Sequence, residues 1–464
     1  MSCRVAIVGG GPGGLMTAYQ LQQRCSVPVD VTIYEASSRL GGKILTSQFA
    51  SAPVPYEAGA AELYDYSQVG EDPLRELVER LGLRVKPMSG TSVIINDNVL
   101  HDFSDVGRVY GEKTQRALVD FDARARRWMN PDEYYESDWR ESNADPKSVE
   151  TFEDELALVP DEAARRYLRT MVHSDLATEP HRTSAAYGLQ NYLMNDASYM
   201  RLYTIEGGIE QLPQELAARV HARMLMHEPV MRVERADGGR IHVFSRRNGS
   251  ADSEDYDFVV IALPNGYLTS IEWGGESLSA AMLRHHVHYD NPAHYLRVSV
   301  LFREPFWGQQ FHESYFMLDA FGGCCLYDES SRNGCVDRGV LGWLLAGDAA
   351  VNAANHTDEE LIEMVLDSLP SFLHHGRELV LEGKVHRYIG SVNGWPGGAP
   401  ALDMEARHIP EPAKPNLFVV GDYLFDSTLN GVLDSADYVA ECLTEEIEAA
   451  SRAPVAEILY SAAD

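Results

Sequence analysis

The stretch "VAIVGGGPGGLMTAYQLQ", residues 5–22, decides the fold. Its pattern predicts a buried strand at residues 4–8, a glycine turn and a helix at residues 13–24, and a second strand follows at residues 29–34. Strand, helix and strand in this order make a βαβ unit, which indicates an α/β fold with a parallel sheet. The spacing Gly9-x-Gly11-x-x-Gly14 is typical of a dinucleotide-binding turn, because glycine lets the backbone approach a pyrophosphate.

The residues after the second strand indicate which dinucleotide binds. Glu35 closes that strand, where its carboxylate can accept hydrogen bonds from ribose hydroxyls. Glu35 is the first residue of the segment "EASSRLGGKILT", residues 35–46, in which Arg39 and Lys43 flank a second glycine pair. A nicotinamide-binding fold has no need for this second pair. The extended FAD molecule needs both the further backbone approach and the compensating positive charge, so we expect FAD.

The composition excludes several classes of partner. The 464 residues carry 39 basic and 70 acidic side chains, a formal net charge of −31, which repels nucleic acid and anionic lipid surfaces. No apolar run approaches the ~18 residues of a membrane span, and the first residues do not resemble a signal peptide. We therefore expect no nucleic-acid partner and no membrane partner.

The six cysteines match neither a zinc-ligand set nor a CxxC pair, so the sequence predicts no metal site. A reducing, cytoplasmic compartment fits this usage best. The neighbouring Cys324 and Cys325 could be redox-active, but buried or idle thiols are the preferred interpretation.

The remaining chain predicts a second domain interleaved with the first. A charged helical pattern at residues 112–194 indicates an inserted helical layer, and "TSVIINDNVLHDF" predicts a hairpin that turns at Asn96-Asp97. Strand patterns return in "YDFVVIALP", "YLRVSVLF" and "RGVLGWLLAG". We expect an FAD-binding domain of residues 1–85, 203–290 and 391–464, and a mixed-sheet plus helical substrate domain of residues 86–202 and 291–390.

Six segments in this order resemble the landmarks of the flavin-containing amine oxidase superfamily, which includes monoamine, polyamine, L-amino-acid and protoporphyrinogen oxidases. They are "EASSRLGGKILT", "YEAGAAELY", "YTIEGGIEQLPQELA", "YDFVVIALP", "LRVSVLFREPFW" and "NLFVVGDY…NGVLDSADYVAECL". The resemblance extends from Val5 to Leu443. It implies an FAD-dependent oxidoreductase with a Rossmann-like cofactor domain.

The resemblance also implies which residues bind FAD. Glu35 would hold the adenosine ribose, Arg39 and Lys43 would lie near the phosphates, and Val230 would frame the adenine through its backbone. Leu433 would offer its N–H to the flavin at the start of a helix whose dipole stabilises negative charge. The full expected set is Gly9, Gly11, Pro12, Gly13, Gly14, Glu35, Arg39, Gly42, Lys43, Gly59, Ala60, Ala61, Val230, Gly421, Asp422 and Leu433.

At three positions the residue in this sequence differs from the one that members of the family commonly have. Val432 and Pro400 stand where monoamine oxidases have two aromatic residues that clamp the amine, and Ala399 stands where some relatives have the cysteine that links the flavin. The comparison implies a non-covalent FAD and a substrate other than a simple arylalkylamine. Tyr64, Tyr187, Tyr192 and Trp395 are candidates for aromatic walls or, alternatively, for core positions.

Glu62 and Arg297 are the candidate catalytic residues. Glu62 falls where amino-acid oxidases commonly have an arginine, and the reversed charge favours a cationic amine over a free α-amino acid. It could also serve as a general acid or base, or be an exposed charge without a role. Arg297 falls where many relatives have a lysine near the flavin, and its guanidinium can grip an oxyanion or carbonyl in two-pronged fashion. A strand arginine paired with a surface acid is the alternative.

A second Gly-Asp segment competes for the flavin. "LAGDAAVN" places Gly347 to Asn352 in a pattern that imitates flavin hydroxylases. The later "LFVVGDYLFDSTLNGV" follows a buried strand and feeds the last long helix, which is what flavin binding near the carboxyl end requires. We therefore expect the later copy to face FAD.

The predicted function is FAD-dependent dehydrogenation of a C–N bond in an amine or amide-like substrate, which gives an imine while O₂ is reduced to H₂O₂. Two alternatives stay open at this point. One is a C–C desaturase of the porphyrinogen oxidase type, and the other is a non-catalytic FAD-binding protein. A homodimer is left open as the oligomeric state.

Overall fold

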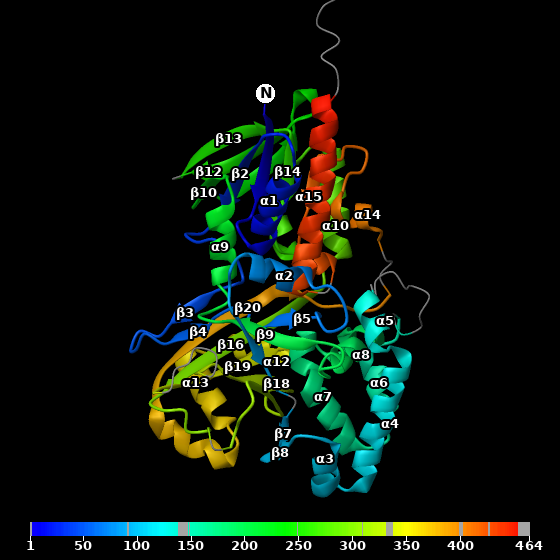
Figure 1. Ribbon diagram of the computed structural model, residues 1–464, viewed down its shortest axis with the longest axis vertical. Helices are drawn as coiled ribbons and strands as arrows, with labels where there is room; N and C mark the ends of the chain where they lie inside the picture. Colours follow the sequence, from blue (N-terminus) through cyan, green and yellow to red (C-terminus); the bar gives the residue numbers. More distant parts are fainter. Residues whose placement is uncertain are drawn as a thin grey trace, which may run out of the picture.

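The computed structural model describes residues 2–90, 92–137, 147, 149–247, 249–308, 310–330, 337–398, 402–425 and 427–452. Its elements form an upper and a lower half around two large sheets, with the helical insert beside the lower sheet (Figure 1). No helix in these described ranges is both long enough and apolar enough to cross a bilayer.

The upper half contains a five-stranded parallel sheet. Its order is β10 (Arg223–Met226), β2 (Val29–Glu35), β1 (Cys3–Val8), β14 (Phe258–Ile261) and β21 (Leu417–Val419). Side chains alternate along β1, so Val5 and Ile7 join one hydrophobic core while Ala6 and Val8 join another. This is why an unbroken apolar run forms a strand here: a parallel sheet is buried on both faces. The predicted βαβ unit and the α/β fold class are confirmed.

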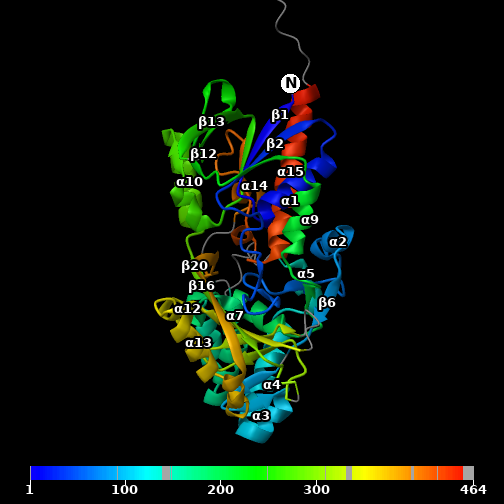
Figure 2. The same cartoon turned by 90° about the vertical axis from the view of Figure 1, so that its left-hand side faces the viewer.

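The parallel sheet is covered differently on its two faces. One face carries α1 (Pro12–Arg24), α9 (Gln211–Arg219) and α15 (Leu429–Arg452). The other side carries a four-stranded sheet and α10 (Glu276–His288), and Figure 2 shows these two layers on opposite sides. The order of that smaller sheet is β13 (Ser250–Tyr256), β12 (Ile241–Arg247), β11 (Val230–Arg235) and β15 (Glu272–Gly274).

The lower half contains a seven-stranded mixed sheet. Its order is β20 (Val380–Asn393), β16 (Pro292–Phe302), β19 (Gly339–Ala346), β18 (Cys324–Asp328), β17 (Tyr315–Leu318), β7 (Val93–Ile95) and β8 (Asn98–Leu100). The pair β17 and β7 is parallel and the other pairs are antiparallel. The predicted hairpin is present, since Asn96 and Asp97 join β7 to β8 with positive φ angles of 48° and 65°.

Helices cover both faces of this mixed sheet. On one face lie α12 (Gly347–Ala353) and α13 (Asp358–Asp367). The other face meets the helical layer predicted for residues 112–194, which is confirmed by α4 (Glu112–Trp128), α5 (Pro131–Glu136), α6 (Phe152–Ala157), α7 (Glu162–Leu176) and α8 (Ala185–Leu193). A further helix, α3 (Phe103–Tyr110), precedes the predicted range. Within β18, Cys325 and Tyr327 face this layer, whereas Cys324 and Leu326 face α12 and α13.

Two small sheets lie between the halves. They comprise β3 (Thr46–Gln48) with β4 (Pro55–Glu57), and β5 (Leu63–Asp65) with β9 (Arg201–Ile205) and β6 (Val85–Met88). Each large sheet draws its strands from separate stretches of the chain, as interleaved domains require. The domain boundaries given above remain a prediction.

Candidate functional site

The glycine turn after β1 is built for close backbone approach. Gly9 has a φ angle of +113°, and its N–H donates to the Tyr34 carbonyl at 2.8 Å. A Cβ on Gly14 would lie 2.1 Å from the Gly9 carbonyl oxygen, so only glycine lets α1 start this close to the strand. Glu35 accepts hydrogen bonds from the N–H groups of Gly10 at 2.9 Å and Ser37 at 2.7 Å. The carboxylate therefore lies beside the turn, as predicted for a ribose-binding group.

The second glycine pair packs against the first. Gly41 donates its N–H to the Gly10 carbonyl at 2.8 Å, and a Cβ on Gly42 would lie 3.1 Å from the Gly11 Cα. The Arg39 guanidinium donates to the carbonyls of Leu40, Gly42 and Ile44 within its own loop. Arg39 therefore stabilises the conformation of the loop. Gly11 and Gly42 face each other without side chains and form a cradle for a ligand.

Lys43 joins the first part of the chain to the last. Its Nζ lies 2.7 Å from Asp422 Oδ2 and 2.9 Å from the Ser391 carbonyl oxygen. The Gly421 N–H donates to Ser435 Oγ at 3.2 Å, which ties the Gly-Asp segment to α15. The structure thus places the predicted Lys43 and Asp422 together, and the ion pair between them was not predicted.

An inner cavity of about 200 Å³ gathers much of the expected site. Its lining comes from both halves of the molecule. The lining residues are Pro12, Lys43, Ile44, Gly59, Ala60, Ala61, Glu62, Leu63, Tyr64, Tyr295, Arg297, Leu344, Tyr388, Val392, Asp422, Ser427, Thr428, Leu429, Asn430 and Val432. Both candidate catalytic residues, Glu62 and Arg297, are therefore brought to one cavity.

Six of the sixteen expected FAD-binding residues line this cavity, and the other ten, Val230 and Leu433 among them, lie outside its lining. Val230 is buried at the start of β11, near Glu35, whose carbonyl accepts the Glu228 N–H at 2.9 Å. Leu433 is the fifth residue of α15. An N–H at that depth lies past the unsatisfied donors of the first turn, and the Leu433 side chain lines a different chamber. Val432, the departure from the aromatic clamp, lines the inner cavity instead.

Glu62 has one carboxylate oxygen bound and one without a protein partner. The Tyr327 hydroxyl donates to Glu62 Oε1 at 3.1 Å. Within the described part of the chain, the buried Oε2 has no hydrogen-bond partner. A buried carboxylate oxygen without a partner is costly, so its place in the cavity wall indicates a cationic or hydrogen-bonding ligand.

Arg297 forms an ion pair with Glu329, an acid that the sequence did not indicate as its partner. Its Nη2 lies 2.6 Å from Glu329 Oε1, and the two residues are 1% and 0% exposed. A Cβ on Gly342 of the adjacent strand would lie 2.4 Å from Glu329 Oε1, so glycine makes room for the pair. Burial lowers the pKa of Arg297, but the Glu329 carboxylate outweighs it and the pKa is raised. Glu329 thus engages Nη2 of the guanidinium, whereas the buried Nε has no hydrogen-bond partner among the described residues, and the alternative of a surface acid is wrong because Glu329 is buried.

Several aromatic walls of the cavity were not predicted. Tyr295 donates its hydroxyl to the Ser174 carbonyl at 2.9 Å, and Tyr388 donates to the Ala58 carbonyl at 2.8 Å, which fixes both rings. Strand periodicity could have found Tyr295, because it lies two residues before Arg297 and shares its face. Tyr192 belongs to the core of the insert, where its hydroxyl donates to Asp122 at 2.9 Å.

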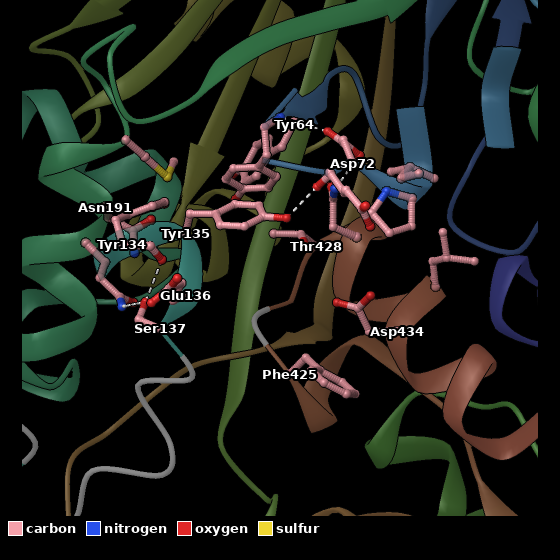
Figure 3. A pocket seen from close by; sticks show the side chains of 18 of the residues that line it. Tyr64, Asp72, Tyr134, Tyr135, Glu136, Ser137, Asn191, Phe425, Thr428 and Asp434 are labelled. Atoms are coloured by element: carbon pink, nitrogen blue, oxygen red, sulfur yellow. Dashed lines mark hydrogen bonds between the residues drawn. The ribbon is translucent and has the colours of Figure 1, made fainter. Parts of the chain in front are cut away.

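An outer chamber of about 430 Å³ adjoins the inner cavity and shares Tyr64, Thr428 and Asn430 with it. Figure 3 shows Tyr134, Glu136 and Ser137 on one side and Asp434 on the other. Among its described lining residues are four acids and no lysine, arginine or histidine. The acids are Glu71, Asp72, Glu136 and Asp434, and the tyrosines are Tyr64, Tyr66, Tyr134, Tyr135 and Tyr187.

Asp175 on α7 is a second carboxyl near Glu62 that sequence reasoning missed. Asn195 Nδ2 donates to it at 3.4 Å. Burial raises the pKa of Asp175 to about 7, and the Glu62 carboxylate contributes to the shift. A single aspartate within a helical pattern does not indicate from sequence that its carboxyl will be buried near Glu62.

The remaining expectations have mixed outcomes. Cys324 and Cys325 are buried and free, and burial raises the pKa of each thiol, in agreement with the idle interpretation. Gly347 starts α12 after a strand of the mixed sheet, whereas Gly421 follows a strand of the parallel sheet, so the later Gly-Asp copy is the one placed as expected. Ala399 and Pro400 lie outside the described residues.

Comparisons with known proteins agree with this geometry. The sequence profile described as "Flavin containing amine oxidoreductase" matches residues 12–444. A probable polyamine oxidase 4 of Arabidopsis thaliana is 33% identical over 117 residues, 25% of this chain and 22% of that protein. A flavin-containing amine oxidase of Oncorhynchus mykiss is 22% identical over 363 residues, 74% of this chain and 65% of that protein. The chain therefore spans less than two thirds of both curated relatives.

Solved structures show the same fold. Cyclohexylamine oxidase from Brevibacterium oxydans IH-35A superposes with a TM-score of 0.74 at 20% identity, over 97% of this chain and all of the other. Putrescine oxidase bound to putrescine superposes with a TM-score of 0.73 at 18% identity, over 96% and 99% of the two chains.

Proposed function

Because the chain belongs to the flavin-containing amine oxidoreductases and is an FAD-dependent oxidoreductase, we propose that it oxidises a cationic amine at the C–N bond. In the overall reaction, amine and O₂ give imine and H₂O₂, so two electrons and two protons pass from the substrate to oxygen. Bound FAD supplies the two-electron acceptor between them.

The residues present fit FAD. Gly11 and Gly42 face each other without side chains that would fill the cradle, and Glu35 stands at the end of the adjoining strand. The inner cavity continues this cradle through Pro12 and Lys43. FAD would be held without a covalent bond, because Ala399 offers no nucleophile to the flavin.

The observation that carries the proposal is Glu62, which lines the inner cavity and whose buried Oε2 has no hydrogen-bond partner among the described residues. The Glu62 carboxylate can accept a hydrogen bond from an ammonium group, and Tyr64, Tyr295 and Tyr388 add aromatic rings, which can attract a cation, to the same lining. The acids of the outer chamber raise the local concentration of cations at its approach. Oriented in this way, the carbon next to nitrogen faces the cofactor while Glu62 holds the nitrogen.

A carbon-only substrate fits these residues less well. A porphyrinogen or polyene would leave Glu62 Oε2 buried without a partner, which costs about 1–3 kcal/mol. For this reason desaturation is not favoured as the main activity.

Anaerobic mixing of the holoenzyme with a panel of amines, amides and amino acids tests the proposal. Cationic amines should bleach the oxidised flavin, and air should restore the colour with release of H₂O₂. In Glu62→Gln we expect kcat/KM to fall about tenfold or more, because a charged hydrogen bond is worth about 1.5–3 kcal/mol, while FAD content is unchanged.

The matched control is Glu359→Gln, which changes an exposed glutamate on α13 that lines neither chamber. It should keep wild-type kinetics. Equal activity of Glu62→Gln and wild type would end the assignment of Glu62, and a flavin that stays oxidised with every amine would favour a non-catalytic FAD-binding protein.

A further inference from the structure

Tyr327 lies behind the wall of the inner cavity, where its hydroxyl binds Glu62. It belongs to β18, is 3% exposed, and is separated from Glu62 by 265 positions in the sequence. It does not line the cavity itself. A buried phenol that reaches a cavity carboxylate from behind can orient it without touching a substrate.

The Tyr327 ring also contacts a cationic side chain of the cavity lining, Arg297. The Arg297 guanidinium carbon lies 4.7 Å from the centre of the ring. Arg297 is bound to Glu329 at 2.6 Å, and Glu329 Oε2 accepts the Glu57 N–H at 2.7 Å. Since Arg297 and Glu329 are buried and engaged with each other, this support has little freedom to move.

The proton needed for the Glu62 contact stays on Tyr327. Burial, together with nearby Cys325 and Glu62, raises the pKa of Tyr327 well above its ordinary value, although Arg297 opposes the shift. The phenol is therefore a donor throughout the working pH range, and Oε1 of Glu62 is occupied by it. This leaves Oε2 as the oxygen without a hydrogen-bond partner among the described residues.

We propose that Tyr327 is the positioning residue of Glu62, supported by the Arg297–Glu329 pair, so that one carboxylate oxygen is held and the other receives the ammonium group of the substrate. The inference rests on the proposed role of Glu62. It also changes the expected role of Arg297, which acts through Tyr327 as a support.

Tyr315 provides a matched control on the neighbouring strand. It lies directly opposite Tyr327 in the β17–β18 register, its ring is 6.3 Å from that of Tyr327, and it is also buried. Tyr315→Phe and Tyr327→Phe each remove one buried hydroxyl from the same face of the sheet. Only the second removes the bond to Glu62.

The experiment compares steady-state kinetics of Tyr327→Phe, Tyr315→Phe, Glu62→Gln and the double variant Glu62→Gln/Tyr327→Phe, all as holoenzymes. We expect Tyr327→Phe to raise the KM for a cationic amine about fivefold to tenfold, and Tyr315→Phe to change it less than twofold. In Tyr327→Phe, kcat should change less than KM, because the lost hydroxyl orients the binding carboxylate and does not touch the substrate. In the Glu62→Gln background, Tyr327→Phe should add little.

The outcomes separate the two proposals. If Glu62→Gln leaves KM unchanged, the proposed function fails first. If Glu62→Gln impairs binding while Tyr327→Phe leaves KM unchanged, or if both phenylalanine variants have equal effects, Tyr327 is a core residue and the inference is overturned. Should Tyr327→Phe lose FAD, fluorinated tyrosine at position 327 keeps the ring, and a KM that does not respond to the acidity of the phenol contradicts the inference.

Discussion

At the scale of single residues, burial changes the pKa of Asp175, a carboxyl close to the site. Asp175 on α7 is half-buried and lies near Glu62, and its pKa is raised to about 7, first by burial and then by the Glu62 charge. Below that pH Asp175 is a neutral carboxyl. Above it, two negative charges share one region.

Asp175→Asn should stabilise the protein at high pH. A carboxyl whose pKa is raised in the folded state makes folding less favourable as the pH climbs from its ordinary 3.8 to about 7, after which the effect levels off. The melting temperature of Asp175→Asn should therefore exceed that of wild type by several degrees at pH 8, and the difference should shrink towards pH 4. The measurement is thermal unfolding with saturating FAD across this range.

Asp120→Asn, a change at an exposed position of α4, serves as the control and should show no such trend. A stability difference for Asp175→Asn that is the same at pH 5 and pH 8 would mean that Asp175 is an ordinary solvated carboxyl.

At the scale of elements, the glycine turn between β1 and α1 combines two physical requirements. Gly14 is needed by the protein itself, because a Cβ there would lie 2.1 Å from the Gly9 carbonyl oxygen. Gly11 is different, since a Cβ there would meet only the Gly42 Cα at an ordinary 3.7 Å. The lack of a side chain at Gly11 therefore leaves room for a ligand in the cradle.

The two alanine variants should separate these requirements. Gly14→Ala should destabilise the apoprotein by about 1–3 kcal/mol through overpacking of α1 against the strand. Gly11→Ala should leave the stability of the apoprotein within about 0.5 kcal/mol and weaken FAD binding about tenfold or more. Denaturant unfolding of the apoproteins and FAD titration measure the two effects, and equal FAD affinity of Gly11→Ala and wild type would contradict the cradle.

At the scale of the whole molecule, the cofactor site joins distant parts of the chain. Lys43 and Asp422 form their ion pair across 379 positions, and the inner cavity takes residues from the seven-stranded sheet, from β5 and from α15. A ligand bound across these parts stabilises the folded state and has no equivalent partner in the unfolded chain.

Removal of FAD should therefore lower the melting temperature, and added FAD should restore it. At a free concentration one hundred times Kd, FAD should raise the free energy of unfolding by about 2.7 kcal/mol. Thermal unfolding over an FAD titration measures this shift. Colour that stays with the acid-precipitated protein would show a covalent flavin and contradict the expectation drawn from Ala399.

The sequence by itself determined the local features of the fold. The glycine turn, the βαβ unit and the hairpin at Asn96-Asp97 follow from spacing over a few residues, because backbone conformation and strand alternation are local properties. The resemblance of six segments then led to the FAD site and to Glu62 and Arg297, and these two residues do meet in one cavity.

Only the tertiary structure decided the partners of those side chains. Glu329 neutralises Arg297, Tyr327 binds Glu62, and Asp175 approaches the same region from the helical insert. No local pattern specifies such contacts, since a buried charge takes its partner from whichever strand or helix packs beside it. The sequence therefore determined where the reacting groups occur along the chain, and burial in the folded molecule determined how they are held and charged.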